Sequence, residues 1–336
     1  MNVHPQRLAR ERSRSPPAVL SGGSSGDRQL LQLVFAASEA SAWLKSQGIE
    51  SQLEDSIAQL GRESTLSDLT VDLCTSTWGR LWQLKRSLPL NILQTWPHRN
   101  WCKIHVVVCG RDDNFDKSLE WMRENCRAAI DVGLLNIYQV ACQDDFLYWH
   151  TSVAKNSAAN VSEGDILVNV DVDNIVGPDF CVDVAERFKY GLAGGHNMVL
   201  HYENVDGTCG RIACFRKDFY DNQGYDEESH PAGAQDVDLL KRLEALPKCR
   251  YQKVNRPSSH AIPNSKQQTV QACDPSIRLT RKDMNAENRN FFIERRRRQP
   301  DLRNQRTGII AVCVEGANHA NPQHEPRKYP SVQVRA

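Results

Sequence analysis

The stretch ILVNVDVDN, residues 166–174, decides the fold expected of this chain. Its apolar start predicts a buried strand, and Asp171 and Asp173 follow with a single residue between them. Residues two apart on an extended strand point to the same side, so the sequence predicts two carboxylates aimed into one cleft. Such hard oxygen ligands suit Mg²⁺ or Mn²⁺, which can bridge the phosphates of a nucleotide. Taken alone, an acidic pair at a strand end is more often a solvated loop.

Strand-like and helix-like segments alternate on both sides of this stretch. Strands are predicted at residues 69–74, 104–109, 135–140 and 165–170, with helices between them at 80–93, 116–126 and 149–160. Strands separated by helices of this length predict an α/β fold with a mostly parallel sheet and right-handed crossovers. The later segments are predicted as helices at 179–190 and 235–246, strand-like runs at 192–200, 210–215 and 251–255, and a glycine-rich loop at 224–233. Because ligands bind beyond the carboxyl ends of parallel strands, the two aspartates lie where a site is expected.

Length and composition narrow the class of protein. The chain has 336 residues, 40% of them hydrophobic and 25% charged, and its net charge of +1 argues against a globally basic nucleic-acid binder. The 11 cysteines form no CxxC pair, so no structural zinc site is indicated. Four parts are predicted: a disordered basic and Ser/Gly-rich tail at 1–27, a helical extension at 28–64, a single catalytic α/β domain at 65–265, and a partly helical C-terminal extension at 266–336.

The sequence predicts no transmembrane segment, because a helical span needs about 20 consecutive apolar residues. The most apolar N-terminal run, 30–37, is followed by polar residues and reads as an amphipathic helix rather than a secretory signal. Without a clear signal or anchor, the prediction is a cytoplasmic protein. The lumen of the Golgi or ER stays open as an alternative if further residues precede Met1.

Polar residues also follow the first predicted strand. Thr75 and Ser76, ahead of Arg80, supply hydroxyls and a guanidinium that can receive the ribose and phosphates of a nucleotide. The competing interpretation is a helix N-cap by Thr75 or Ser76, and the residues alone do not separate the two.

Two later features complete the candidate site. Asp236 and Asp238 lie in the first turn of a predicted helix, where capping is the ordinary role of a carboxylate. A carboxylate that faced the site could instead deprotonate an acceptor hydroxyl. His260 follows the strand-like run 251–255, and a lone histidine is more often an ordinary surface or core residue than a metal ligand.

The order and spacing of these motifs resemble the GT-A glycosyltransferases, in particular the inverting family 2 enzymes and the β-1,4-galactosyltransferase and chondroitin-synthase-like branches. In that family a strand-end D-x-D is followed by a G-[WFY]-x-x-E-D-x-D-L segment and then by a metal-binding histidine. Here Asp236 lies 63 residues after Asp173, and His260 lies 24 residues after Asp236. The lead-in at 155–165 and the run at 210–216 are also similar to the family pattern, so the resemblance covers about residues 66–265.

The resemblance implies a metal-dependent transferase that moves a hexosyl or N-acetylhexosaminyl group from a nucleotide sugar, most simply a UDP-sugar, to a hydroxyl with inversion. It implies Asp236 as the catalytic base and Asp173 with His260 as ligands of Mn²⁺ or Mg²⁺. The implied donor-binding residues are Thr75, Ser76, Arg80, Asp113, Lys155, Asn156 and Asp171, and the implied acceptor-binding residues are Gly224, Tyr225 and Asp238. The expected partners are a nucleotide-sugar donor and a glycan, protein or small-molecule acceptor, without nucleic acid.

Three departures from the family pattern leave alternatives open. Gln235 stands where the family has glutamate, the segment 110–113 is a loose version of D-D-x-S, and residues 266–336 match nothing in the pattern. Gln235 keeps open a catalytically inactive nucleotide-sugar or glycan-binding module of the same fold. A third hypothesis, ranked low, is an RNA-associated protein that uses the basic runs at 10–14 and 295–298, which are short and lack interleaved aromatic residues.

Overall fold

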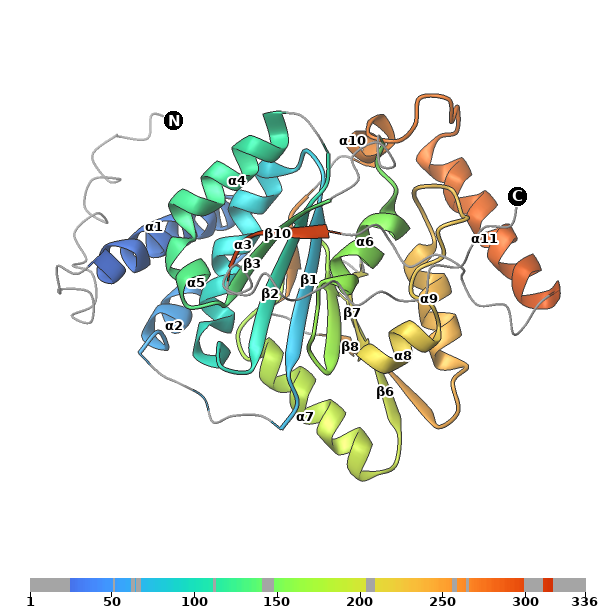
Figure 1. The fold of residues 1–336 in the computed structure, drawn as a ribbon, viewed down its shortest axis with the longest axis horizontal. Coiled ribbons are helices and arrows are strands. Elements are labelled where there is room, and N and C mark those ends of the chain that lie inside the picture. Colours follow the sequence, from blue (N-terminus) through green and yellow to red (C-terminus); the bar gives the residue numbers. More distant parts are fainter. Residues whose placement is uncertain are drawn as a thin grey trace, which may run out of the picture.

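An eight-stranded mixed sheet forms the centre of the protein, in the order β10-β3-β2-β1-β4-β7-β6-β8 (Figure 1). The computed structural model describes residues 25–50, 52–61, 64, 68–110, 113–140, 148–203, 209–255, 259–263, 266–298 and 311–316. Four neighbouring strands run parallel: β1 (Val71–Thr77), β2 (Cys102–Val108), β3 (Leu135–Val140) and β4 (Ile166–Val170). The predicted α/β class with a mostly parallel sheet is confirmed.

Further strands extend this parallel centre on both sides. β7 (Cys209–Phe215) runs antiparallel to both β4 and β6 (Asn197–Glu203), and β8 (Cys249–Asn255) pairs in parallel with β6. At the opposite edge, β10 (Ala311–Glu315) runs antiparallel to β3. A separate two-stranded ribbon pairs β5 (Asn174–Ile175), directly after the two aspartates, with β9 (His260–Ala261).

Helices cover both faces of the sheet (Figure 1). Leu73 of β1 packs into the core on one face, whereas the next residue, Cys74, packs into the core on the other. Strands buried on both faces need apolar side chains on both sides, as Val106 and Val107 of β2 show by packing into the two opposite cores. The first face carries α3 (Leu81–Thr95), α4 (Asp113–Asn125), α5 (Arg127–Asp131) and α7 (Phe180–Ala193), with α1 (Ser25–Ser46) and α2 (Leu53–Ala58) packed outside α3; the second carries α6 (Thr151–Asn160), α8 (Arg216–Asp221) and α9 (Gln235–Glu244).

The carboxyl ends of β1 and β4 flank the point where the strand order reverses. From β1 the chain passes through α3 to β2 on one side, whereas α6 leads to β4 on the other side of β1. Open α/β sheets bind their ligands in the crevice at such a switch point. Residues 75–80 and 171–173 meet there.

Several boundaries differ from those predicted. β1 continues through Thr77, so the polar residues expected after the strand are part of it. β6 begins at Asn197, because α7 continues to Ala193 and a turn separates the two. The N-terminal extension forms α1 and α2, with α1 beginning at Ser25, and residues 1–24 of the predicted tail lie outside the described residues. None of the helices in the described ranges has the length and apolar character needed to cross a membrane.

The chain beyond residue 265 packs against the same body. It forms α10 (Lys266–Gln271) and the long helix α11 (Arg281–Arg298), which lies beside α9 in Figure 1. A small apolar cluster joins this part to the loop that precedes α9, through Ala232, Cys273 and Met284. The C-terminal region therefore reaches the candidate site as well as the sheet edge.

Candidate active site

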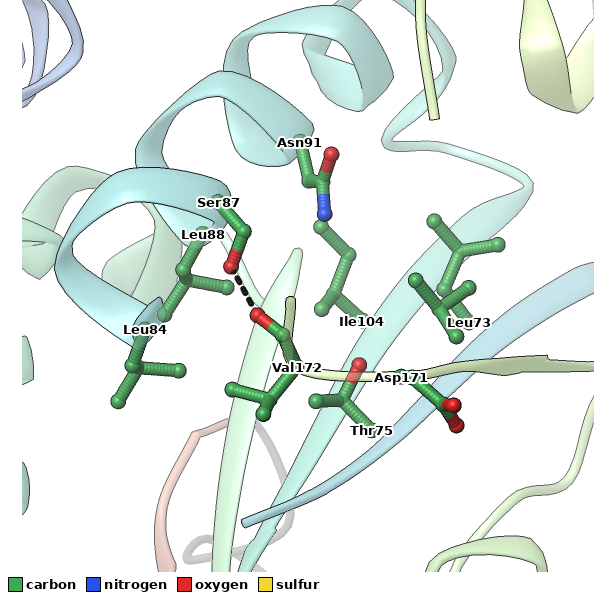
Figure 2. Close-up of a pocket in the computed structure, with 10 residues that line it drawn as sticks. Leu73, Thr75, Leu84, Ser87, Leu88, Asn91, Ile104, Asp171 and Val172 are labelled. Atoms are coloured by element: carbon green, nitrogen blue, oxygen red, sulfur yellow. Dashed lines mark hydrogen bonds between the residues drawn. The ribbon is translucent and has the colours of Figure 1, made fainter. Parts of the chain in front are cut away.

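Thr75 and Ser76 lie within β1, not after it as predicted. Thr75 and Ser76 pair with Val106 and Val107 in the ladder between β1 and β2, and neither caps α3. The capping interpretation is therefore wrong, because the strand continues past both residues. Thr75 is 7% exposed and lines a small cavity of about 10 Å³ beneath α3, next to Asp171 (Figure 2). Ser76 is half-buried and, by the alternation of a strand, points to the other face.

The two central aspartates lie in a turn rather than on the strand. β4 ends at Val170, and the Asn174 N–H donates to the Asp171 carbonyl over 2.8 Å. The predicted extended tip is therefore wrong, because the chain turns directly after β4. Instead, each carboxylate faces its own cation: Asp171 faces Lys155, and Asp173 faces Arg80 at 3.5 Å.

A row of buried polar side chains on α3 holds this turn. Ser87 Oγ donates to the Val172 carbonyl over 2.6 Å, as Figure 2 shows, and Asn91 Nδ2 donates to the Asn174 carbonyl over 2.9 Å. Further along the chain, Asn91 Oδ1 accepts from the N–H of residue 176, and Gln94 Oε1 accepts from the N–H of residue 177. Buried backbone groups need such partners, so α3 fixes the path of the turn that carries the two aspartates.

β7 passes close to this turn at Gly210. A Cβ atom at Gly210 would lie 2.6 Å from Asn174 Nδ2 and 3.0 Å from Asp171 Oδ2. The Gly210 carbonyl also accepts hydrogen bonds from the Asp171 N–H over 2.9 Å and from Asn169 Nδ2 over 3.1 Å. The close approach of the Gly210 backbone thus helps to orient Asp171.

Lys155 of α6 joins the aspartate turn to α9. Its Nζ lies 3.0 Å from Asp171 Oδ1 and 2.8 Å from Asp236 Oδ1, and its side chain is 4% exposed. Burial alone would lower the pKa of Lys155, but the charges of Asp171 and Asp236 outweigh it and raise this pKa well above its usual value. For Asp171, burial is likewise outweighed by Lys155 and by the amide of Asn169, so its pKa is lowered. Lys155 therefore stays charged between the carboxylates of Asp171 and Asp236.

Asp236 does not cap its helix. It is the second residue of α9, whose N-cap residue, Ala234, makes no side-chain capping bond, and an Asp236 oxygen accepts from Lys155 instead. The structure thus brings Asp236 to the same cation as Asp171, although 65 residues separate the two in sequence.

Arg80 and Asp173 form the other charged pair of the site. Arg80 occupies the N-cap position of α3, and its second guanidinium nitrogen donates to Thr269 of α10. Asp173 also accepts from Asn174 Nδ2 over 2.8 Å. This pair connects the first strand end, the aspartate turn and the C-terminal region.

His260 lies on β9, and the ribbon with β5 brings it near Asp173. His260 is opposite Ile175, and the Ile262 N–H donates to the Asp173 carbonyl over 2.6 Å. The ribbon therefore ties the segment that carries His260 to the backbone of Asp173. Burial and the charge of Arg211 lower the pKa of His260. A neutral imidazole is the form that binds a metal ion.

The donor atoms of this pair fit a metal ion that the substrate helps to hold. In the described ranges, no three or more His, Cys, Asp and Glu side chains gather as a metal-binding group. Mg²⁺ and related ions are commonly held by one or two carboxylates together with substrate phosphates rather than by a cage of protein ligands. One carboxylate from Asp173 and one imidazole from His260 fit such a site.

The remaining predicted residues lie around the loop before α9. Asn156 donates to the Tyr225 carbonyl and accepts from the Tyr225 N–H, both over 2.8 Å, so it holds the loop. Tyr225 is buried with its ring centroid 5.2 Å from Lys155 Nζ, and the Gly224 carbonyl accepts from Arg242 over 2.7 Å. Asp113 begins α4, and its side chain lies outside the described part of the structure.

Asp238 is 4% exposed and has both carboxylate oxygens in ion pairs. Arg242 Nε lies 2.8 Å from one oxygen, and Arg296 of α11 lies 2.7 Å from the other. Through Arg242, which also bonds the Gly224 carbonyl, Asp238 orients the loop rather than facing away from the protein.

Sequence reasoning missed the residues that reach the site from the C-terminal region. Arg281, the first residue of α11, is half-buried, and burial lowers its pKa while the nearby charges of Asp236 and Asp171 act in the opposite sense. Thr269 of α10 also reaches the site, because its hydroxyl accepts a hydrogen bond from Arg80. No motif marks either residue, because nothing local in the sequence places it beside the aspartates.

The chain was compared with protein families, curated proteins and solved structures. No family model and no curated protein matches it. S. aureus TarS residues 1–349 superpose with a TM-score of 0.45 and 14% identity, over 57% of this chain and 60% of that one. The Pyrobaculum calidifontis mannosyltransferase PcManGT, in complex with GDP-Man and Mn²⁺, gives 0.43 and 15%, over 68% and 64%. GalNAc-T7 with UDP, GalNAc and Mn²⁺ gives 0.43 and 12%, over 58% and 47%. The chain spans less than two thirds of each of these three structures, and at these scores the likeness establishes neither family nor activity.

Proposed function

We propose that the protein is a GT-A-type glycosyltransferase that moves a sugar from a nucleotide donor, most simply a UDP-sugar, to an acceptor hydroxyl. One observation carries this proposal: Lys155 bridges Asp171 and Asp236 at the switch point of the sheet. Asp171 follows the strand end where a nucleotide would bind. Asp236, at the start of α9, follows a loop and lies on the other side of Lys155. A donor-side group and a candidate base thus meet at one buried cation.

The proposed reaction is a single displacement with inversion. The acceptor oxygen bonds to the anomeric carbon, the bond from that carbon to the diphosphate oxygen breaks, and Asp236 takes the hydroxyl proton. Asp171 orients the ribose or sugar of the donor, and Lys155 fixes both carboxylates. Arg80 receives the phosphates of the nucleotide, whereas Thr75 and Ser76 are consecutive residues of β1 that point to opposite faces of the sheet.

Asp173 and His260 would hold Mn²⁺, or Mg²⁺, together with the donor diphosphate. When bound, such an ion neutralises negative charge on the leaving diphosphate. Arg80 pairs with Asp173 across a long contact of 3.5 Å, so its guanidinium is placed to exchange this carboxylate for a phosphate oxygen.

The structural role of Gln235 supports catalysis over the inactive binding module. Gln235 is buried, and its Nε2 donates to the His230 carbonyl over 3.0 Å. A glutamate carboxylate could not make this donation, so the departure from the family pattern has a local structural reason. The RNA hypothesis loses support as well, because Arg295 and Arg296 are engaged in ion pairs with Asp226 and Asp238.

A donor screen tests the proposed function. The purified protein is incubated with Mn²⁺ and a panel of UDP- and GDP-sugars, with and without mixed acceptors, and release of the nucleoside diphosphate is measured. Acceptor-dependent release that disappears in Asp236→Asn supports transfer. Tight nucleotide-sugar binding without release from any donor would favour the binding module instead.

A further inference from the structure

The loop that leads into Asp236 has an unfavourable backbone conformation that needs support from other parts of the protein. Gly233 has φ +106° and Ala234 has φ +63°, so two consecutive residues are left-handed just before α9 begins. An alanine is disfavoured in this conformation and keeps it only where surrounding structure imposes it. The position of Asp236 therefore depends on what holds residues 230–234.

Asn288 of α11 holds this segment directly. It is fully buried, its Oδ1 accepts from the His230 N–H over 2.7 Å, and its Nδ2 donates to the carbonyls of His230 and Gly233 over 3.0 and 2.8 Å. These bonds use both the acceptor and the donors of one carboxamide, a combination that neither alanine nor aspartate provides. Gln235 donates to the same His230 carbonyl, so the bonds converge on one point of the loop.

The contact between loop and helix is tight at its centre. A Cβ atom at Gly233 would lie 2.8 Å from the Asn285 Cα, so the loop backbone rests directly on α11. Apolar contacts of Ala232 with Met284 close the same interface. The loop and α11 are thus held together by close packing as well as by hydrogen bonds.

Ion pairs extend the contact along the helix. Arg295 lies 2.6 Å from Asp226 and 3.0 Å from Glu228, and Glu287 lies 2.8 Å from His230. Residues 284, 288 and 295 follow helical spacing and form one stripe that faces the loop. The donor-side turn, by contrast, accepts hydrogen bonds from Ser87 and Asn91 of α3.

We infer that α11 is a clamp that sets the acceptor side of the site, with Asn288 as its central positioning residue. Asn288 acts through the loop: it fixes residues 230–234, and these fix Asp236 at the start of α9. This inference rests on the proposed function, and it deepens it by assigning acceptor positioning to a helix far along the chain. Because α3 holds the donor side separately, loss of Asn288 should separate transfer from nucleotide binding.

The test compares Asn288→Ala with Asn290→Ala, a matched exposed asparagine on the same helix. Three quantities are measured in the full chain with Mn²⁺ present: the Kd for UDP by calorimetry, kcat/KM for the acceptor, and Tm. A misplacement of about 1 Å can cost on the order of 10²-fold in rate. We therefore expect Asn288→Ala to lose about that much in kcat/KM while the Kd for UDP changes less than about threefold, and Asn290→Ala to match the wild type. Unchanged transfer in Asn288→Ala, or an equal loss of UDP binding, would overturn the inference.

Hydrogen exchange keeps the inference testable without activity. If Asn288 clamps the loop, the amides of residues 230–235 exchange faster in Asn288→Ala than in Asn290→Ala, while those of the aspartate turn are unchanged. Equal exchange rates in the two variants would contradict the inference that α11 clamps the loop.

If the wild type transfers no sugar from any donor, the proposed function fails, and the exchange result still decides whether α11 clamps the loop. Should Asn288→Ala not fold, Arg295→Gln takes its place, with the same expected direction and a smaller effect.

Discussion

The two sides of the site are built by different means. On the proposed donor side, Asp171 and Asp173 follow a central strand, and α3, from the same βαβ region, holds their turn through Ser87 and Asn91. On the proposed acceptor side, Asp236 follows a loop that is held by α11, more than 50 residues further along the chain. Lys155 pairs with an aspartate from each side. The donor side therefore follows from strand order, whereas the acceptor side depends on contacts between distant segments.

The largest effect is expected from Asp236→Asn, which separates the two sides chemically. A positioned general base contributes roughly 10²–10⁴-fold to rate. Transfer should fall by this factor, while the Kd for UDP stays nearly constant because the nucleotide contacts lie on the other side. Initial rates with saturating donor, and calorimetry with UDP, measure the two quantities. Equal losses of transfer and of UDP binding would contradict the division between the sides.

Lys155→Met should disturb both sides together. Without Lys155, Asp171 and Asp236 face each other without a cation. Breaking a fully buried pair costs about 3–5 kcal/mol, and because these carboxylates are 32% and 24% exposed, the loss of stability should be smaller. The lowered pKa of Asp171 stabilises the wild type above the ordinary aspartate pKa, and this contribution is lost as the pH falls through the folded pKa. The variant should therefore lose less stability than the wild type on acidification. Urea denaturation between neutral and acidic pH measures this, and parallel pH profiles would contradict the bridging role.

Asp173→Ala tests the donor side alone. If Asp173 holds Mn²⁺ with the donor diphosphate, the variant should lose most donor binding and turnover, and EDTA should do the same to the wild type. The loop on the acceptor side should keep its hydrogen-exchange protection. Full wild-type activity in excess EDTA would remove the metal from the proposal.

His260→Ala should have a smaller effect of the same kind. Losing even an outer partner of a metal typically costs 10–100-fold in affinity, so we expect the apparent Mn²⁺ affinity to weaken roughly 10-fold or more. His196→Ala, at an exposed position, is the control. Superimposable Mn²⁺ titrations of the two variants would return His260 to an ordinary position on β9.

The sequence anticipated the donor side better than the acceptor side, for physical reasons. Alternating apolar runs are a local signal, so β1 to β4 and the helices between them could be predicted. The ion pair of Lys155 with Asp236 joins residues 81 apart, and no local pattern specifies it. α11 buries only Met284, Asn288 and Phe292, and one of these three is polar, so its sequence shows little of the apolar periodicity that marks a packed helix. Polar residues at helical spacing among the leucines of α3, such as Ser87 and Asn91, are the one local pattern that could have indicated a helix bonded to the aspartate turn.

The smallest effect on turnover is expected from Asp238→Asn, which weakens the acceptor side without touching its base. Asp238 is buried, and its two oxygens pair with Arg242 and Arg296, so it orients the loop and joins α9 to α11. Asparagine keeps one acceptor oxygen but loses the charge, and hydrogen bonds to charged groups are worth about 1.5–3 kcal/mol. The free energy of unfolding, from urea denaturation, should fall by about this amount, while turnover per folded molecule falls by less than the ~10²-fold lower limit expected for Asp236→Asn. Turnover is therefore normalised to the folded fraction in both variants. If Asp238→Asn abolishes transfer and Asp236→Asn does not, the base is Asp238, and the two arginines must release it when the acceptor binds.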